Sequence, residues 1–114
     1  MIDITAGQQA ETQAAEYLRT KGYKILDQNW KTPVCEIDIV AQKDKRIYFV
    51  EVKYRLTDSQ GSGLGYITPK KLKRMKFAAE VWVKNRNWEG DYSLSAIELS
   101  GPAYVVTAFL PDLT

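Results

Sequence analysis

Two neighbouring strand-like segments constrain this chain most, because each carries charged residues within an otherwise apolar run. Residues 35–41 alternate polar and apolar side chains with the period of two that is typical of a β-strand. Residues 47–54 are rich in β-branched and aromatic side chains, which also indicates a strand. The polar run at residues 43–46 predicts a turn between them, so we expect a pair of adjacent antiparallel strands.

The charged residues of this pair are Asp38 in the first strand and Glu51 and Lys53 in the second. Glu51 and Lys53 are two residues apart, so both project from one face of their strand. Charges in an apolar strand are costly unless they are paired or bind a metal. Asp38 and Glu51 could supply carboxylate ligands to Mg²⁺, with the carbonyl of Val52 beside them, and Lys53 could stabilise charge on a phosphate.

A second interpretation of the same residues stays open. Lys53 could instead form a cross-strand salt bridge with Asp38 or Glu36 on a solvated sheet face. Glu36 shares a face with Asp38, so it could be a further metal ligand or a partner for Arg55. Spacing alone does not separate these interpretations.

Glu11 favours the metal site. A helix is predicted at residues 8–21, and at about 100° per residue Glu11 falls inside its apolar arc. A carboxylate in a buried stripe is unusual, and it could serve as a third acid at the metal. The alternative is a carboxylate favoured by the helix dipole at the N-terminal turn.

The remaining segments complete an α/β fold with the order α-β-β-β-α-β-β, in which helices flank a mixed five-stranded sheet. The chain length of 114 residues suits one domain spanning residues 1–114. A glycine- and serine-rich mobile loop is expected at residues 55–66. The other elements are a strand at residues 23–30, a helix at residues 69–85 capped by Thr68, and strands at residues 92–99 and 103–110.

The second helix combines an apolar stripe with a basic face. The stripe predicted to face the core contains Leu72, Met75, Ala79, Trp82 and Val83. Basic residues follow on other faces, and with Arg55 they form a candidate nucleic-acid-binding set of Lys70, Lys71, Lys73 and Arg74, since such residues supply non-specific affinity for DNA. The alternative is a solvated helix face. Phe77 and Val81 lie among these cations and suggest a homodimer contact.

Composition excludes several classes of site. The chain has a single cysteine, Cys35, and no histidine, so it has no intramolecular disulfide, no zinc-finger type site and no Ser-His-Asp triad. No apolar run is long enough to span a membrane, and the N-terminal sequence does not resemble a secretion signal. We therefore expect a cytoplasmic protein without a membrane partner.

Five short motifs follow one another along the first three quarters of the chain. They are AETQA at residues 10–14, GYKIL at 22–26, CEID at 35–38, FVEVKYR at 49–55 and ITPKK at 67–71. In this order they resemble the motifs of the YraN-like family of bacterial proteins, which is similar to Holliday-junction resolvases of the PD-(D/E)xK nuclease superfamily. Ala10 and Cys35 stand where that family usually has glycine, and its late R-F-D motif is replaced around Tyr92 and Ser93.

The resemblance implies a restriction-endonuclease-like core with Glu11, Asp38, Glu51 and Lys53 at a metal site. The leading hypothesis is an endonuclease that uses Mg²⁺ or Mn²⁺ to hydrolyse DNA phosphodiester bonds, including those of branched or junction DNA. Two rival hypotheses are a non-catalytic nucleic-acid-binding protein and an interaction module on the same fold. An intact set of these four residues would favour the nuclease, because binding alone does not need it.

Overall fold

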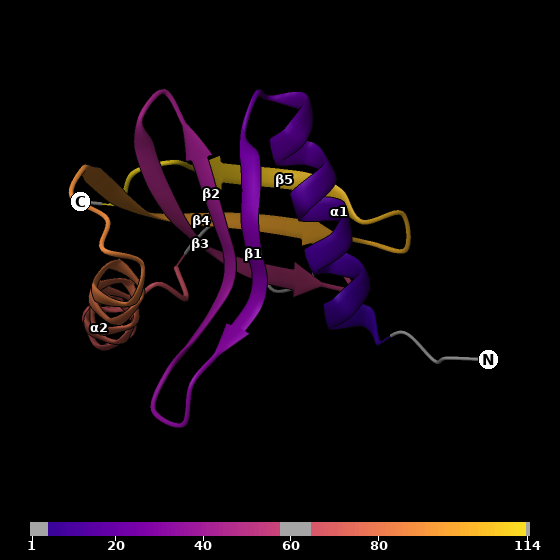
Figure 1. Cartoon of the computed structure of the whole chain (residues 1–114). Coiled ribbons are helices and arrows are strands. Elements are labelled where there is room, and N and C mark those ends of the chain that lie inside the picture. Colours follow the sequence, from indigo (N-terminus) through magenta and orange to yellow (C-terminus); the bar gives the residue numbers. More distant parts are fainter. Residues whose placement is uncertain (1–4, 58–64, 114) are drawn as a thin grey trace.

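The computed structural model describes residues 5–57 and 65–113, and within them the elements follow the predicted order α-β-β-β-α-β-β (Figure 1). Residues 58–64 of the expected mobile loop lie outside the described residues. The helices are α1 (Ala6–Thr20) and α2 (Pro69–Arg86). The strands are β1 (Lys24–Lys31), β2 (Glu36–Lys43), β3 (Arg46–Arg55), β4 (Asp91–Ser100) and β5 (Val105–Leu110).

The strands form one sheet with the order β1-β2-β3-β4-β5, which confirms the predicted mixed five-stranded sheet. Strands β1, β2 and β3 form an antiparallel meander, and β4 and β5 are also antiparallel. Strand β4 runs parallel to β3, with α2 in the connection between them. A parallel pair needs such a crossover because its strands cannot be joined by a tight turn.

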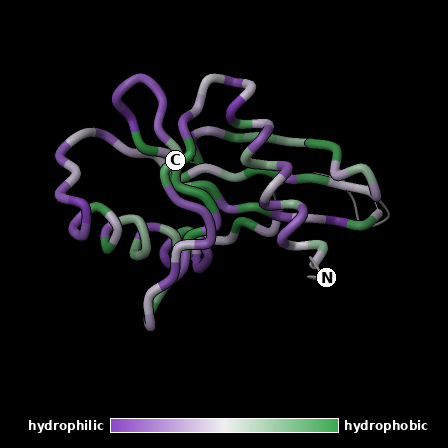
Figure 2. Tube along the Cα trace, turned by 45° about the vertical axis from the view of Figure 1, so that its right-hand side comes forward, coloured by the Kyte–Doolittle hydropathy of each residue, from purple (hydrophilic) through white to green (hydrophobic). Residues whose placement is uncertain are grey.

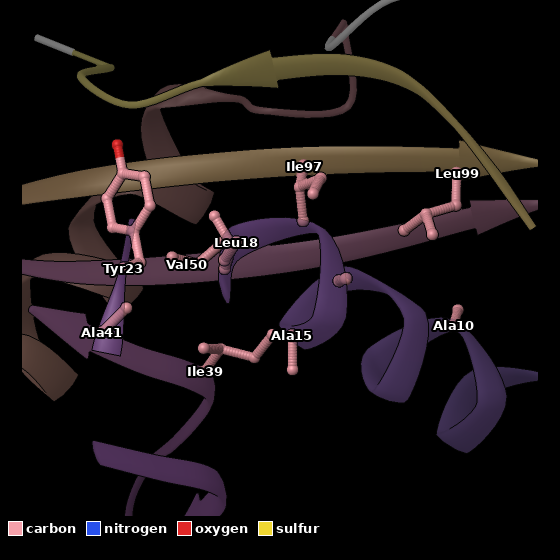
Figure 3. Packing of buried hydrophobic residues seen from close by; sticks show 10 residues of the cluster. Ala10, Ala15, Leu18, Tyr23, Ile39, Ala41, Val50, Ile97 and Leu99 are labelled. Atoms are coloured by element: carbon pink, nitrogen blue, oxygen red, sulfur yellow. The ribbon is translucent and has the colours of Figure 1, made fainter. Parts of the chain in front are cut away.

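Apolar side chains of the central strands alternate between two cores, one on each face of the sheet. Ile39 and Val50 pack with α1, whereas Val40 and Phe49 pack with α2. Figure 3 shows Ala15 and Leu18 of α1 among strand residues of the first core, and Figure 2 shows apolar segments in the central strands and polar ones at the outer turns. The two helices therefore cover opposite faces, as period-two alternation requires.

Short-range signals account for most of the element boundaries. Helix α1 begins before the predicted residue 8, because Thr5 and Gln8 form a reciprocal capping box. Thr68 caps α2 as predicted, and its hydroxyl accepts a hydrogen bond from the backbone N–H of Lys71 at 3.1 Å. Asp44 and Lys45 have φ of 51° and 67° in the turn between β2 and β3, as a two-residue hairpin turn with left-handed residues requires.

The predicted start of β5 at residue 103 is wrong by two residues. Tyr104 has a φ of 53°, and its N–H donates to the carbonyl of Gly101 at 3.1 Å, so a turn continues to this point. The Tyr104 ring stacks on Tyr54, with centroids 4.8 Å apart, which holds the turn against β3. The strand begins only after this contact, at Val105.

Helix α2 has the apolar stripe predicted for it, with two differences. Ala79 and Trp82 are buried, Leu72, Met75 and Val83 are half-buried, and Ala78 joins the buried set. Val81 is half-buried rather than exposed, while Phe77 is 51% exposed. No helix among residues 5–57 and 65–113 is long and apolar enough to cross a membrane.

Asp27 of β1 anchors the C-terminal half of α2 to the sheet. Its carboxylate accepts hydrogen bonds from the indole N–H of Trp82 and from the guanidinium of Arg86, both at 2.9 Å. The Trp82 ring also packs edge-to-face on Phe49 of β3. These contacts fix where the other end of α2, with its basic residues, lies relative to β2 and β3.

Candidate functional site

Strands β2 and β3 separate at the position where Asp38 and Glu51 lie. Their pairing extends to Ile39 and Val50, and no further pair follows toward the start of β2. The backbone N–H of Val52 instead donates to Oδ2 of Asp38 at 2.8 Å. The N–H and C=O of one strand residue point to the same side, so the Val52 carbonyl also faces this fork. The predicted carboxylate and carbonyl are therefore brought together.

Glu51 is paired with a lysine of α2 rather than with Lys53. The Nζ atom of Lys71 lies 2.7 Å from Oε2 of Glu51, with the two side chains 29% and 22% exposed. Lys71 was predicted as a DNA contact. In the structure, Lys71 lies in the first turn of α2, and through Glu51 it contacts a cluster of acidic side chains around Asp38 and Glu51, the acidic cluster.

Glu11 of α1 reaches the same cluster. Its side chain is half-buried and lies within hydrogen-bonding reach of the Asp38 carboxyl. Because α1 starts at Ala6, Glu11 lies beyond the first helical turn, in which the helix has no acidic residue. The alternative based on the helix dipole is therefore wrong, and the position in the apolar arc is confirmed.

Burial and mutual repulsion make the ionised form of Asp38 unfavourable. Loss of solvent, followed by the Glu51 charge, raises the pKa of Asp38 to about 7, and the hydrogen bond from Val52 opposes this rise. Burial is also the main cause of the raised pKa of Glu11, which nearby Glu36 and Glu51 raise further. Such a cluster would gain from a nearby divalent cation, which would favour the charged forms.

Lys53 lies against Tyr66. Its Nζ atom lies 5.7 Å from the centre of the Tyr66 ring. Within the described residues it forms no ion pair with Asp38 or Glu36, so the proposed cross-strand salt bridge is wrong.

The Tyr66 hydroxyl is a donor that sequence reasoning missed. It is buried and has no hydrogen-bond partner in the described part of the chain. Burial and the nearby charges of Glu51 and Glu98 raise its pKa, so it keeps its proton. An unmatched buried hydroxyl beside carboxylates is suited to donating to a water molecule or to a phosphate oxygen held there.

Arg55 pairs with a buried residue that the sequence analysis did not select. Its Nε donates to Oε2 of Glu98 at 2.8 Å, and the Glu98 side chain is 0% exposed. The Thr107 hydroxyl donates to the other carboxylate oxygen at 3.0 Å. The suggested pairing of Arg55 with Glu36 is wrong. Arg55 instead has a structural role through its ion pair with Glu98. The sequence feature that could have identified Glu98 is its charge within the otherwise apolar run of β4.

The acidic cluster opens into a cleft of about 550 Å³ between β2, β3 and α2. Asp38 and Glu51 line it, and Glu36 lies exposed at its edge. Of the predicted DNA contacts, Lys71, Lys73 and Arg74 line this cleft, whereas Lys70 does not. Lys31 of β1, which sequence reasoning missed, adds a further cation. The remaining lining side chains include Val34, Cys35, Met75 and Phe77.

The donor types in the cluster match those that Mg²⁺ and Mn²⁺ prefer. Carboxylates of Asp38, Glu51 and Glu11, a backbone carbonyl and an unmatched hydroxyl are all oxygen groups. In the described ranges, however, no three acidic, cysteine or histidine side chains are grouped closely enough to hold a metal ion. Glu51 is directed to the Lys71 ammonium instead. The chemistry of these residues therefore suits a divalent cation. In this structure, however, the cation that contacts Glu51 is the ammonium of Lys71.

Comparison with known proteins assigns the family. The model of the Uncharacterised protein family UPF0102 matches residues 10–99. A UPF0102 protein of Vibrio campbellii is 38% identical over 96 residues, which are 82% of this chain and 79% of that protein. One from Sulfurihydrogenibium is 39% identical over 92 residues, or 80% of each chain. One from Rhodopseudomonas palustris (strain HaA2) is 49% identical over 79 residues, or 68% of this chain and 59% of that protein. The chain therefore belongs to the UPF0102 family, the YraN-like family that its motifs predicted.

Proposed function

We propose that this protein is a metal-dependent endonuclease that hydrolyses DNA phosphodiester bonds. The observation that carries the proposal is the position of Asp38, Glu51 and Glu11. They come from three different elements. Asp38 and Glu51 line a cleft with basic residues on its α2 side, and Glu11 of α1 interacts with the Asp38 carboxyl. Perturbed carboxylates in a cleft are typical of functional sites, because a stable fold alone gains nothing from them.

Asp38, Glu51, Glu11 and the carbonyl of Val52 would hold Mg²⁺ or Mn²⁺. When bound, the metal would lower the pKa of a water molecule and neutralise charge on the phosphate. Lys53 lies on the same strand face as Glu51, where its ammonium could balance negative charge on the phosphate. The Tyr66 hydroxyl could donate a hydrogen bond to a phosphate oxygen or to the attacking water.

The α2 side of the cleft would bind the DNA backbone. Lys73 and Arg74 are both exposed and line the cleft, close to the acidic cluster. Lys70 lies in the same first turns of α2 and is also exposed. Contacts of this kind bind phosphates without reading sequence, so they suit a substrate that is recognised by its shape.

A second candidate function is DNA binding without cleavage. The Lys71–Glu51 ion pair favours it, since it leaves the acidic cluster without the grouping that a metal needs. A cleavage assay separates the two functions. Linear, flapped and four-way-junction DNA would each be incubated with the full chain in Mg²⁺, in Mn²⁺ and with a chelator. Cleavage that requires the metal supports the nuclease, and binding without cleavage on all substrates supports the alternative.

Metal should stabilise the folded protein. A ligand that binds only the native state raises the free energy of unfolding by about 2.7 kcal/mol at a hundredfold excess over its Kd. We therefore expect the melting temperature to rise with Mn²⁺ or Mg²⁺ concentration, measured by calorimetry at constant ionic strength. The Glu51→Gln variant is the control and should lose most of this rise. Equal melting temperatures with and without millimolar metal would argue against a metal site.

Removal of two cations from the cleft should weaken DNA binding. We expect Lys73→Ala/Arg74→Ala to lower affinity and to reduce the slope of log K against log salt by roughly 2, because about 0.9 counterions are released per phosphate contact. Fluorescence anisotropy at several salt concentrations would measure both quantities.

The matched control for this experiment is Lys24→Ala/Lys45→Ala. It removes the same charge from two exposed residues that do not line the cleft. If both double variants lose affinity and slope equally, the effect is one of net charge. The proposed DNA-binding surface would then be wrong.

A further inference from the structure

Two lysines lie near Glu51, and they differ in what they contact. Lys53 is exposed, and its ammonium lies over the Tyr66 ring. Lys71 makes a direct ion pair with Glu51 at 2.7 Å, in a half-buried position that solvent screens less than a surface pair. The cation that neutralises the acidic cluster is therefore supplied by α2 and not by the E-x-K motif.

We propose that Lys71 is a built-in counter-ion of Glu51 that a divalent cation must displace. This inference rests on the proposed metal site and adds a regulatory step to it. The Lys71 ammonium and a metal ion would use the same carboxylate oxygen, and two cations so close together would repel each other. Metal occupancy and the Lys71–Glu51 contact would therefore exclude each other.

The structure allows Lys71 to leave without movement of the helix. The backbone N–H of Lys71 is held by the Thr68 cap, and Asp27 anchors the opposite end of α2 through Trp82 and Arg86. The lysine side chain is flexible and partly exposed, so a rotation of its stem would release Glu51. The displaced ammonium would stay on the side of the cleft that Lys73 and Arg74 line.

Competition of this kind makes a specific prediction about metal affinity. Lys71→Met removes the ammonium but keeps most of the apolar stem. In titrations of the full chain with Mn²⁺ by calorimetry, without DNA, we expect it to tighten binding about tenfold, within the range of typical coupling between two sites. Lys71→Arg, which keeps the charge, should restore an affinity close to that of the parent.

Lys76→Met is the charge-matched control. Lys76 lies on the same helix, is exposed and does not line the cleft, so its loss should change Mn²⁺ affinity by less than about twofold, as expected for a screened surface charge. If Lys71→Met and Lys76→Met bind Mn²⁺ equally, the counter-ion inference is wrong, while metal binding by the parent would still support the nuclease proposal. If neither the parent nor Lys71→Met binds Mn²⁺, both proposals are overturned. If only Lys71→Met binds, Lys71 is confirmed as a competitor, and the parent is not a metal-dependent enzyme.

Discussion

Replacement of Asp38 by asparagine should abolish metal-dependent DNA cleavage and stabilise the metal-free protein above pH 7. Asparagine keeps the shape of the side chain, and its carbonyl oxygen can still accept the hydrogen bond from Val52. It removes one of the carboxylates proposed to hold the metal. Loss of such a ligand should reduce cleavage by a factor of at least about 10³, in line with the several kcal/mol that metal ions supply to charge stabilisation.

The gain in stability follows from the pKa of Asp38. Its ordinary value of 3.8 rises to about 7 in the folded protein, because burial and the Glu51 charge disfavour ionisation. Between these two values the folded state binds more protons than the unfolded state, so the free energy of unfolding falls as pH rises. The resulting loss of stability reaches its full value above pH 7. Each unit of difference between the folded and unfolded pKa corresponds to about 1.4 kcal/mol. We expect Asp38→Asn to recover roughly 2 kcal/mol of this loss above pH 7 and almost none near pH 4.

Urea unfolding in a chelator at pH 4, 6 and 8 would measure this difference. Glu80→Gln is the control, since it removes a carboxylate from an exposed position on α2 and should change stability little at any pH. A lower free energy of unfolding for metal-free Asp38→Asn than for the parent at pH 8, together with a parent that cleaves none of the DNA substrates in metal, would contradict the nuclease proposal. Asp38 would then have only a structural role in the sheet.

The sequence predicted the elements of this fold well because their signals are local. Thr68 and Pro69 indicate the start of α2 within two residues, and the alternation of residues 35–41 identifies β2 without knowledge of its neighbours. The start of β5 was missed because it depends on Tyr104, which contacts Tyr54 about fifty residues earlier in the chain. A contact between distant segments has no signature in the local pattern.

The same distinction explains what was predicted of the candidate site. Asp38, Glu51 and Glu11 stood out because a charge in an apolar run is visible in the sequence itself. The partner of each charge was not visible, since it depends on how α2 is placed over the fork between β2 and β3. Spacing assigned Lys53 to the cluster, whereas packing brings Lys71 onto Glu51. Tyr66 could not be identified either, because nothing in its neighbours predicts an unmatched hydroxyl.

Replacement of Arg55 should destabilise the protein more than any change at the cleft surface. Arg55 forms an ion pair with Glu98 of β4, whose side chain is fully buried. Removing one member of a buried ion pair typically costs about 3–5 kcal/mol, because the other charge stays in a poorly solvated place. We expect Arg55→Met to lower the free energy of unfolding by this amount, measured by urea unfolding at pH 7.

Two further variants separate the buried pair from a general effect of arginine. Arg19→Met breaks an exposed pair with Glu16 on α1 and should cost less than about 1 kcal/mol. Arg55→Met/Glu98→Leu replaces both charges by apolar groups, and it should recover most of the stability lost by Arg55→Met, since well-packed apolar residues can replace a buried ion pair. If Arg55→Met is as stable as Arg19→Met, Arg55 does not support the fold through Glu98. Its guanidinium would then again be a candidate for binding phosphate, together with the basic residues of α2.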